Sequence, residues 1–157
     1  GNFRKSTEAF GKGLELHPNW IWGNIKKAYG HVYLKEYDKA LAHAARAEEL
    51  FQDGWGSELL QVTLVFIYKN CGEIKKADAG TKRFLKYAAE NTLEDPWNLS
   101  FIYYLNGEFQ KAIEWEEKTV EMKSPSAYLM YLPIFYSKEF FQGDAHQAIL
   151  RKMGFVK

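Results

Sequence analysis

The sequence is poor in cysteine, proline and net charge, and each shortage excludes a class of protein. Cys71 is the single cysteine among 157 residues, which excludes an intramolecular disulfide and a multi-cysteine metal site. Only four prolines occur, and the frequent alanine, glutamate, lysine and leucine favour helix over sheet. The 21 basic and 20 acidic residues are interleaved and leave a net charge of +1, which argues against nucleic acid and anionic membranes as partners.

Long hydrophobic runs are also missing. The longest, residues 62–68 and 127–136, are far shorter than the roughly 20 residues that cross a bilayer. No signal peptide is recognisable. We therefore expect no membrane partner and a cytoplasmic location. The chain begins within a helical pattern, so we also expect it to be a fragment that has left any targeting segment behind.

Motifs for catalysis and for cofactors are absent from the sequence as well. The four histidines never pair at the i, i+4 spacing of a metal site, and HExxH, CxxC and the phosphate-binding glycine motifs do not occur. Cys71 has no base beside it that would activate a nucleophile. The acidic run Glu114, Glu116, Glu117 and Glu121 is predicted to be a solvated helix face. The histidines are assigned structural or surface roles. We expect no enzyme activity, no cofactor and no metal.

Aromatic residues are what the sequence has in excess, at 17% of the chain. Rings in such number fill gaps between helices or line a binding surface. No alternation typical of strands persists along the chain, so an all-α fold is predicted. The expected helices cover residues 2–16, 20–34, 40–51, 55–70, 74–90, 97–105, 109–122, 127–135 and 139–153.

The breaks between these helices carry their own signals. Pro18 ends the first helix, and residues 35–38 form the next turn. Gly54 is predicted to cap the third helix, and Asp95 before Pro96 is a start signal for a later one. Pro133 should kink or end the helix over 127–135.

A repeat of about 35 residues connects these helices. Small residues recur where each second helix of a pair begins, at intervals of 34, 37 and 35 residues: Ser6, Ala40, Ala77 and Ala112. A tyrosine precedes three of the turns, at Tyr33, Tyr68 and Tyr103.

This pattern resembles the tetratricopeptide repeat (TPR), whose 34-residue unit carries W-x₂-L-G-x₂-Y and A-x₃-F before a proline. The pairs that fit its first helix are Gly30 and Tyr33, Leu64 and Tyr68, and Leu99 and Tyr103. The second half of a repeat is matched by Ser6, Phe10, Gly13 and Pro18. The chain departs from the pattern in a turn before Tyr37 that is two residues short, and at Thr81 and Glu116, which stand where an aromatic residue is expected.

The resemblance implies a right-handed superhelix of antiparallel helix pairs, an α-solenoid of about four repeats with a C-terminal capping helix. Residues 1–157 would form one repeat domain with units 1–19 (partial), 20–54, 55–92, 93–125 and the cap 126–157. The C-terminal part, which ends in HQAILRKMGF, resembles the segment that closes TPR regions attached to bacterial signalling proteins such as adenylate cyclases and transcriptional regulators.

The helix over residues 97–105 is apolar on both sides. Its rings Trp97, Phe101 and Tyr104 share one face, so that face must be buried or meet a partner. TPR proteins bind peptides along their first helices, and the resemblance assigns a groove to Lys27, His31, Val62, Phe66, Lys69, Trp97, Phe101 and Tyr104. Apolar residues replace most of the lysine and asparagine clamp of chaperone-binding members, so an apolar segment such as an amphipathic helix is the expected ligand.

The expected function is therefore a non-catalytic scaffold for protein–protein interaction. Three other arrangements satisfy the same pattern. The rings pack on the next helix of the superhelix, the chain's own tail fills the groove, or the chain is a self-association domain that dimerises a larger signalling protein. In the last case the interface would lie in the aromatic stretch 128–136.

Overall fold

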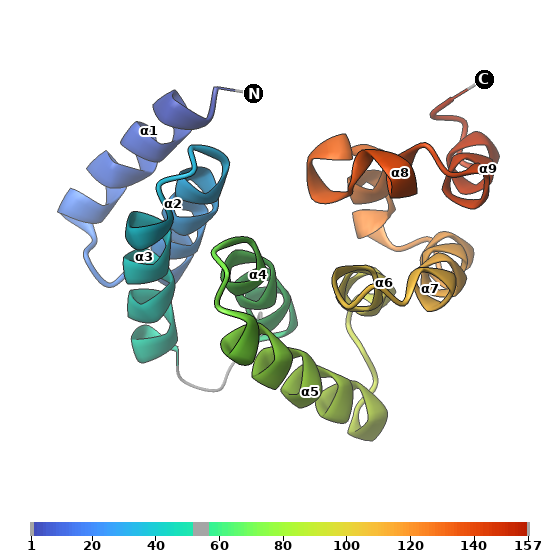
Figure 1. Ribbon diagram of the computed structural model, residues 1–157, viewed down its shortest axis with the longest axis horizontal. Coiled ribbons are helices and arrows are strands. Elements are labelled where there is room, and N and C mark those ends of the chain that lie inside the picture. Colours follow the sequence, from blue (N-terminus) through green and yellow to red (C-terminus); the bar gives the residue numbers. More distant parts are fainter. Residues whose placement is uncertain (1, 52–56, 157) are drawn as a thin grey trace. The chain divides into compact units, whose positions relative to one another are not determined.

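The structure is a computed structural model that describes residues 2–51 and 57–156. These residues form helices and connections with no β-strand among them, which confirms the all-α prediction (Figure 1). The elements are α1 (Phe3–Leu16), α2 (Ile21–Tyr33), α3 (Tyr37–Leu50), α4 (Ser57–Asn70), α5 (Ile74–Glu90), α6 (Pro96–Leu105), α7 (Phe109–Glu121), the 3₁₀ helices η1 (Pro125–Tyr131) and η2 (Pro133–Phe135), α8 (Lys138–Phe141) and α9 (Asp144–Lys152).

Most helix limits match the local signals, and three do not. Tyr37 and Asp38 belong to α3 rather than to the turn before it. The predicted helix over 127–135 consists of two 3₁₀ segments separated at Leu132, since Pro133 lacks the amide that a continuous helix needs. The predicted helix over 139–153 is two helices divided at Gly143. The expected cap at Gly54 and the helix start at residue 55 lie outside the described residues.

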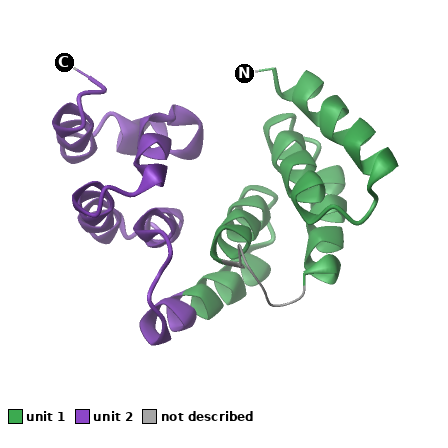
Figure 2. Cartoon of the chain, turned by 180° about the vertical axis from the view of Figure 1, so that it is seen from behind, with its two compact units in different colours: residues 1–84 green, residues 85–157 purple. Residues whose placement is uncertain are grey.

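Backbone contacts divide the chain into two compact units, residues 1–84 and 85–157 (Figure 2). Unit 1 contains α1 to α4 and most of α5, and unit 2 contains the remainder of α5 and everything that follows it. The repeat boundaries proposed from the sequence stay predictions.

One turn geometry joins the helices of three pairs, α2–α3, α4–α5 and α6–α7. Its central residue lies in the left-handed region, with φ of 59° at Lys35, 81° at Gly72 and 80° at Gly107. In each turn the next residue is a glutamate, whose amide donates to a carbonyl five residues earlier at 2.9 Å. This is the Schellman ending of a helix. Glycine adopts it without strain, whereas Lys35 does so at a cost of about 1 kcal/mol.

The repeated turn corrects the sequence alignment of the first pair. Glu36 bonds back to His31, as the corresponding glutamates bond back to Tyr68 and Tyr103. His31, and not Tyr33, is therefore the equivalent of those tyrosines, and the turn before Tyr37 is of normal length.

The second helices of the three pairs bury the same positions. The buried residues, at i, i+4 and i+7 in each helix, are Ala40, Ala44 and Ala47 in α3, Ala77, Thr81 and Phe84 in α5, and Ala112, Glu116 and Thr119 in α7. Thr81 and Glu116 thus occupy the core position at which the TPR pattern has an aromatic residue.

The first helix departs from this register by one residue. Ser6 is exposed, and Thr7 is buried instead. A Cβ at Gly30 would lie 2.2 Å from Thr7 Oγ1, which itself donates to the Phe3 carbonyl at 2.7 Å. Only glycine at position 30 lets α1 cross α2 this closely.

Candidate functional site

The start of α6 is fixed by a local cap. Asp95 Oδ1 accepts a hydrogen bond from the Trp97 amide at 3.0 Å and another from Ser124 Oγ at 2.9 Å, and Pro96 occupies the first helical turn. This confirms the start signal seen in the sequence and places Trp97 at the first turn of the helix. The cap also ties α6 to the segment that follows α7.

Three rings form one row along α6, as the sequence predicted. Trp97 and Phe101 stack with centroids 4.9 Å apart, and Phe101 and Tyr104 stack at 5.9 Å. We call these three residues the aromatic face of α6. Trp97 and Phe101 each keep only 2% of their surface exposed.

The chain's own C-terminal segment covers this face. The covering residues, 133–141, are called the C-terminal cover. Phe135 meets Trp97 edge-on at 5.6 Å, and Tyr136 and Phe140 each lie 4.9 Å from the Tyr104 ring. These contacts account for burial that the sequence left unexplained.

Two hydrogen bonds orient the cover on the rings. Trp97 Nε1 donates to the Tyr136 hydroxyl at 3.1 Å, and the Ser137 amide donates to the Tyr104 hydroxyl. Burial raises the pKa of Tyr136 well above its usual value, and the nearby Glu116 carboxylate acts in the same direction. The phenol therefore stays protonated, as an acceptor from Trp97 that can still donate.

A buried acid–base pair lies behind the cover. His146 Nδ1 and Glu116 Oε2 are 2.8 Å apart, and their side chains are 1% and 0% exposed. His146 Nε2 donates to the Met130 carbonyl at 3.1 Å, because a carbonyl can only accept. The pair thereby links α7, η1 and α9.

The prediction that Glu116 lies on a solvated face is wrong. Its neighbours Glu114, Glu117 and Glu121 are exposed, but Glu116 follows the buried Ala112 by one helical turn. That spacing was the signal for a core position. Nothing local indicated His146, because its partner is 30 residues away.

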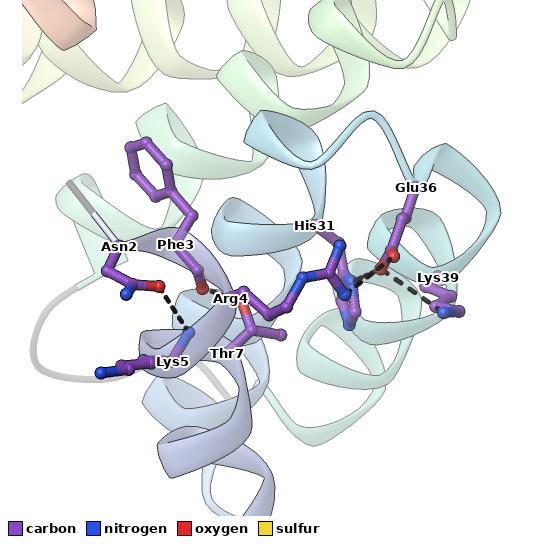
Figure 3. Close-up of polar contacts among 8 residues, drawn as sticks. All are labelled: Asn2, Phe3, Arg4, Lys5, Thr7, His31, Glu36 and Lys39. Atoms are coloured by element: carbon purple, nitrogen blue, oxygen red, sulfur yellow. Dashed lines mark hydrogen bonds and ion pairs between the residues drawn. The ribbon is translucent and has the colours of Figure 1, made fainter.

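In unit 1, Lys27 and His31 line a cleft of about 400 Å³ between α1, α2 and α3, most of whose lining residues are charged. Glu36 is the centre of the polar contacts there (Figure 3). Its Oε2 lies 2.7 Å from His31 Nδ1 and 3.4 Å from Lys39 Nζ, and its Oε1 lies 3.9 Å from Arg4 Nη1. The hydrogen bond from His31 lowers the pKa of Glu36, with further lowering by Lys39.

The repeated turns show why Lys27 and His31 differ from the other predicted groove residues. The positions equivalent to Val62, Phe66 and Lys69 in α4, and to the aromatic face of α6, are Ile25, Tyr29 and Val32 in α2. The sequence alignment was two residues out of register in this helix. Tyr29 of α2 and Phe66 of α4, which are equivalent residues of consecutive pairs, stack on each other with ring centroids 5.1 Å apart.

The eight predicted groove residues are thus divided between the units. Unit 1 holds Lys27, His31, Val62, Phe66 and Lys69, and unit 2 holds Trp97, Phe101 and Tyr104. Val62 is 1% and Phe66 5% exposed, whereas Lys69 is exposed on the surface. Whether these residues bind a ligand remains a prediction.

A second histidine stacks on His31. The rings of His31 and His43 are 5.8 Å apart and nearly parallel, and His43 Nδ1 donates to Asn24 Oδ1 at 2.9 Å. Burial, with smaller contributions from Lys27 and His31, lowers the pKa of His43 from 6.5 to about 4.

The depressed pKa of His43 predicts a loss of stability in acid. The unfolded chain takes up a proton near the ordinary pKa, whereas the folded chain does so only near pH 4, so folding weakens as the pH falls between these values. His43→Gln should flatten this part of the pH profile of the urea midpoint. The exposed His17→Gln is the control and should leave the profile unchanged. A His43→Gln profile that overlays the parent would contradict the assignment.

Among the described residues, no three of the types histidine, cysteine, aspartate and glutamate are grouped so that they could hold a metal ion. No helix in that part of the chain has the length and apolar character needed to cross a bilayer. No family model, curated protein or solved structure matches the chain.

Proposed function

We propose that this chain is a TPR-like, non-catalytic interaction module that binds a peptide or an amphipathic helix along its first helices. The recurrence of one turn and of three buried positions, at intervals of 37 and 35 residues, carries the proposal. Helix pairs that repeat at this length stack into solenoids, whose first helices line an extended binding surface. A right-handed superhelix of about four repeats with a C-terminal cap belongs to the same proposal.

The equivalent positions on the first helices indicate what the partner is made of. They hold Ile25, Tyr29 and Val32 in α2, Val62, Phe66 and Lys69 in α4, and the aromatic face in α6, and all the aliphatic members and Phe66 are buried. The part of these positions that reaches the surface of unit 1, the Tyr29 ring beside apolar neighbours, is suited to an apolar helix face, in which a few buried side chains supply most of the affinity. Tyr29 is half-buried and so keeps part of its ring at the surface.

The test is a selection of peptides from a displayed library of helical sequences on the full chain. We expect the selected peptides to be apolar and their dissociation constants to rise about tenfold or more in Tyr29→Ala, the usual effect of losing an aromatic anchor. Tyr37→Ala is the matched control, because Tyr37 is 41% exposed at the start of the second helix of the pair. Circular dichroism checks that both variants fold.

Two results would count against the binding module. One is a library that yields no peptide binding above the level of a scrambled pool. The other is equal loss of affinity in the Tyr29→Ala and Tyr37→Ala chains. A peptide that binds along the first helices contacts Tyr29 and not Tyr37, so only Tyr29→Ala should weaken its binding.

Self-association is the second candidate function, and exposed aromatic residues in unit 2 favour it. Tyr128 is 57% and Tyr131 45% exposed, three residues apart along η1, and Phe155 stacks on Tyr131 at 5.1 Å. Residues spaced by three share one side of a 3₁₀ helix. Contiguous exposed apolar surface of this kind is typical of protein interfaces. Light scattering separates the candidates: a monomer agrees with the binding module, and a dimer that Tyr131→Ser dissociates agrees with self-association.

A further inference from the structure

The C-terminal cover has little local structure of its own. It consists of the three residues of η2, a short connection and the four residues of α8. Helices this short are not stable by themselves, and 3₁₀ hydrogen bonds have poorer geometry than α-helical ones. Tertiary contacts with α6, with Phe109 of α7 and with His146 of α9 therefore supply most of the free energy that holds the cover in place. Segments of this kind open at lower free energy than the helices they cover.

The cover makes the contacts that a short peptide ligand would make. Two adjacent aromatic residues, Phe135 and Tyr136, contact Trp97 and Phe101, and a third, Phe140, lies four residues further on against Tyr104. In its two hydrogen bonds with the aromatic face, the Tyr136 hydroxyl accepts from Trp97 and the Ser137 main-chain amide donates to Tyr104. Ring burial and main-chain bonding are the usual means of peptide recognition.

The residues on either side of the cover are held independently of α6. Met130 accepts a hydrogen bond from His146, and His146 is paired with Glu116 of α7. Residues 132–143 can consequently leave α6, and the Phe109 and His146 rings that they also contact, as a closed loop while the bonds of His146 to Met130 and Glu116 keep η1 and α9 attached. The entropy cost of loop closure rises only slowly with length, so a loop of this size opens without dissolving its ends.

We propose that the C-terminal cover is an intramolecular ligand that regulates access to the aromatic face of α6. The competing external ligand is a peptide with two adjacent aromatic residues and a third aromatic residue four positions after the second. This inference rests on the proposed function, since it names the ligand class and the regulation of one of the same first-helix faces. The apparent affinity of such a peptide is reduced by the fraction of chains in which the cover is open.

The first test uses a labelled peptide with the sequence of residues 132–141, LPIFYSKEFF, and the full chain. Phe135→Ala/Phe140→Ala removes two rings of the cover and leaves the aromatic face intact. We expect this variant to bind the peptide at least about tenfold more tightly than the parent, because its open fraction is larger. Lys138→Ala/Glu139→Ala is the matched control within α8, as both side chains are exposed, and should bind like the parent. A scrambled peptide should bind neither.

The second test needs no variant, so it holds even where the double alanine chain does not fold. Hydrogen exchange of the parent should show the amides of residues 135–141, Ser137 among them, exchanging at least about tenfold faster than those in the middle of α6 and α7. Exchange of the cover together with α6 in one cooperative step would overturn the inference, as would equal peptide affinity in the double alanine chain and the control.

Failure of this inference is distinguishable from failure of the proposed function. If the cover does not open while library peptides still bind in a Tyr29-dependent manner, the intramolecular ligand is refuted and the binding module stands. If neither library peptides nor the cover peptide bind any chain, both proposals are refuted.

Discussion

Replacing His146 with leucine should lower the free energy of unfolding by about 3 kcal/mol or more, the cost of leaving a buried acidic side chain without its partner. Glu116 is 0% exposed, so water cannot replace the imidazole that lies 2.8 Å from its Oε2. The same change removes the donor to the Met130 carbonyl. Urea denaturation followed by circular dichroism measures the loss.

The double variant Glu116→Leu/His146→Leu shows whether the pair itself stabilises the fold. Two apolar residues in place of a buried polar pair are often neutral or stabilising, so most of the loss should be recovered. Glu117→Leu on the exposed side of α7 is the control and should shift stability by less than about 0.5 kcal/mol. A His146→Leu chain as stable as that control would show that the buried pair does not form.

Trp97→Ala should destabilise the chain by about 3–5 kcal/mol, as expected for removing a fully buried large aromatic side chain. Trp97 is 2% exposed, stacks on Phe101, and meets Phe135 and the Tyr136 hydroxyl. Its removal leaves a cavity between α6 and the cover. Urea denaturation followed by circular dichroism again measures the change.

A conservative variant and a control test the contribution of Trp97 to stability. Trp97→Phe keeps most of the ring and loses the hydrogen bond to Tyr136, for which we expect about 1 kcal/mol. Trp115→Ala is the control, because Trp115 is half-buried and the Lys118 ammonium lies over its ring, 3.9 Å from the ring centre. Its loss should cost about 1 kcal/mol, the strength of an exposed cation–π contact. Equal losses of stability in Trp97→Ala and Trp115→Ala would contradict the burial of Trp97 beneath the C-terminal cover.

Local signals in the sequence were sufficient for most of the helices. Pro18, Asp95 before Pro96, and the glycines at 72 and 107 act through hydrogen bonds or backbone preferences within a few residues. The alignment failed in α2 because Lys35 adopts a conformation that normally identifies glycine. Treating Lys35-Glu36 as equivalent to Gly72-Glu73 would have aligned Ile25, Tyr29 and Val32 of α2 with the predicted groove positions of α4 and α6.

The candidate site was predicted only in part. The common face of Trp97, Phe101 and Tyr104 follows from the helical period and is present. Lys27 and His31 were assigned to groove positions that Ile25 and Tyr29 occupy, because the turn at Lys35 was misaligned by two residues. The His146–Glu116 pair was missed because its members are 30 residues apart, and a glutamate among exposed glutamates gives no sign of its burial.

By itself the sequence determined an all-α chain with glycine turns at Gly72 and Gly107 and with a buried alanine near the start of each second helix, at intervals of 37 and 35 residues. Those features depend on interactions between neighbours along the chain. Only the tertiary structure decided that the aromatic face of α6 is covered and by which residues. The cover lacks the periodicity of a stable helix, so its position is set by the free energy of burying rings more than 30 residues away, which no local pattern encodes.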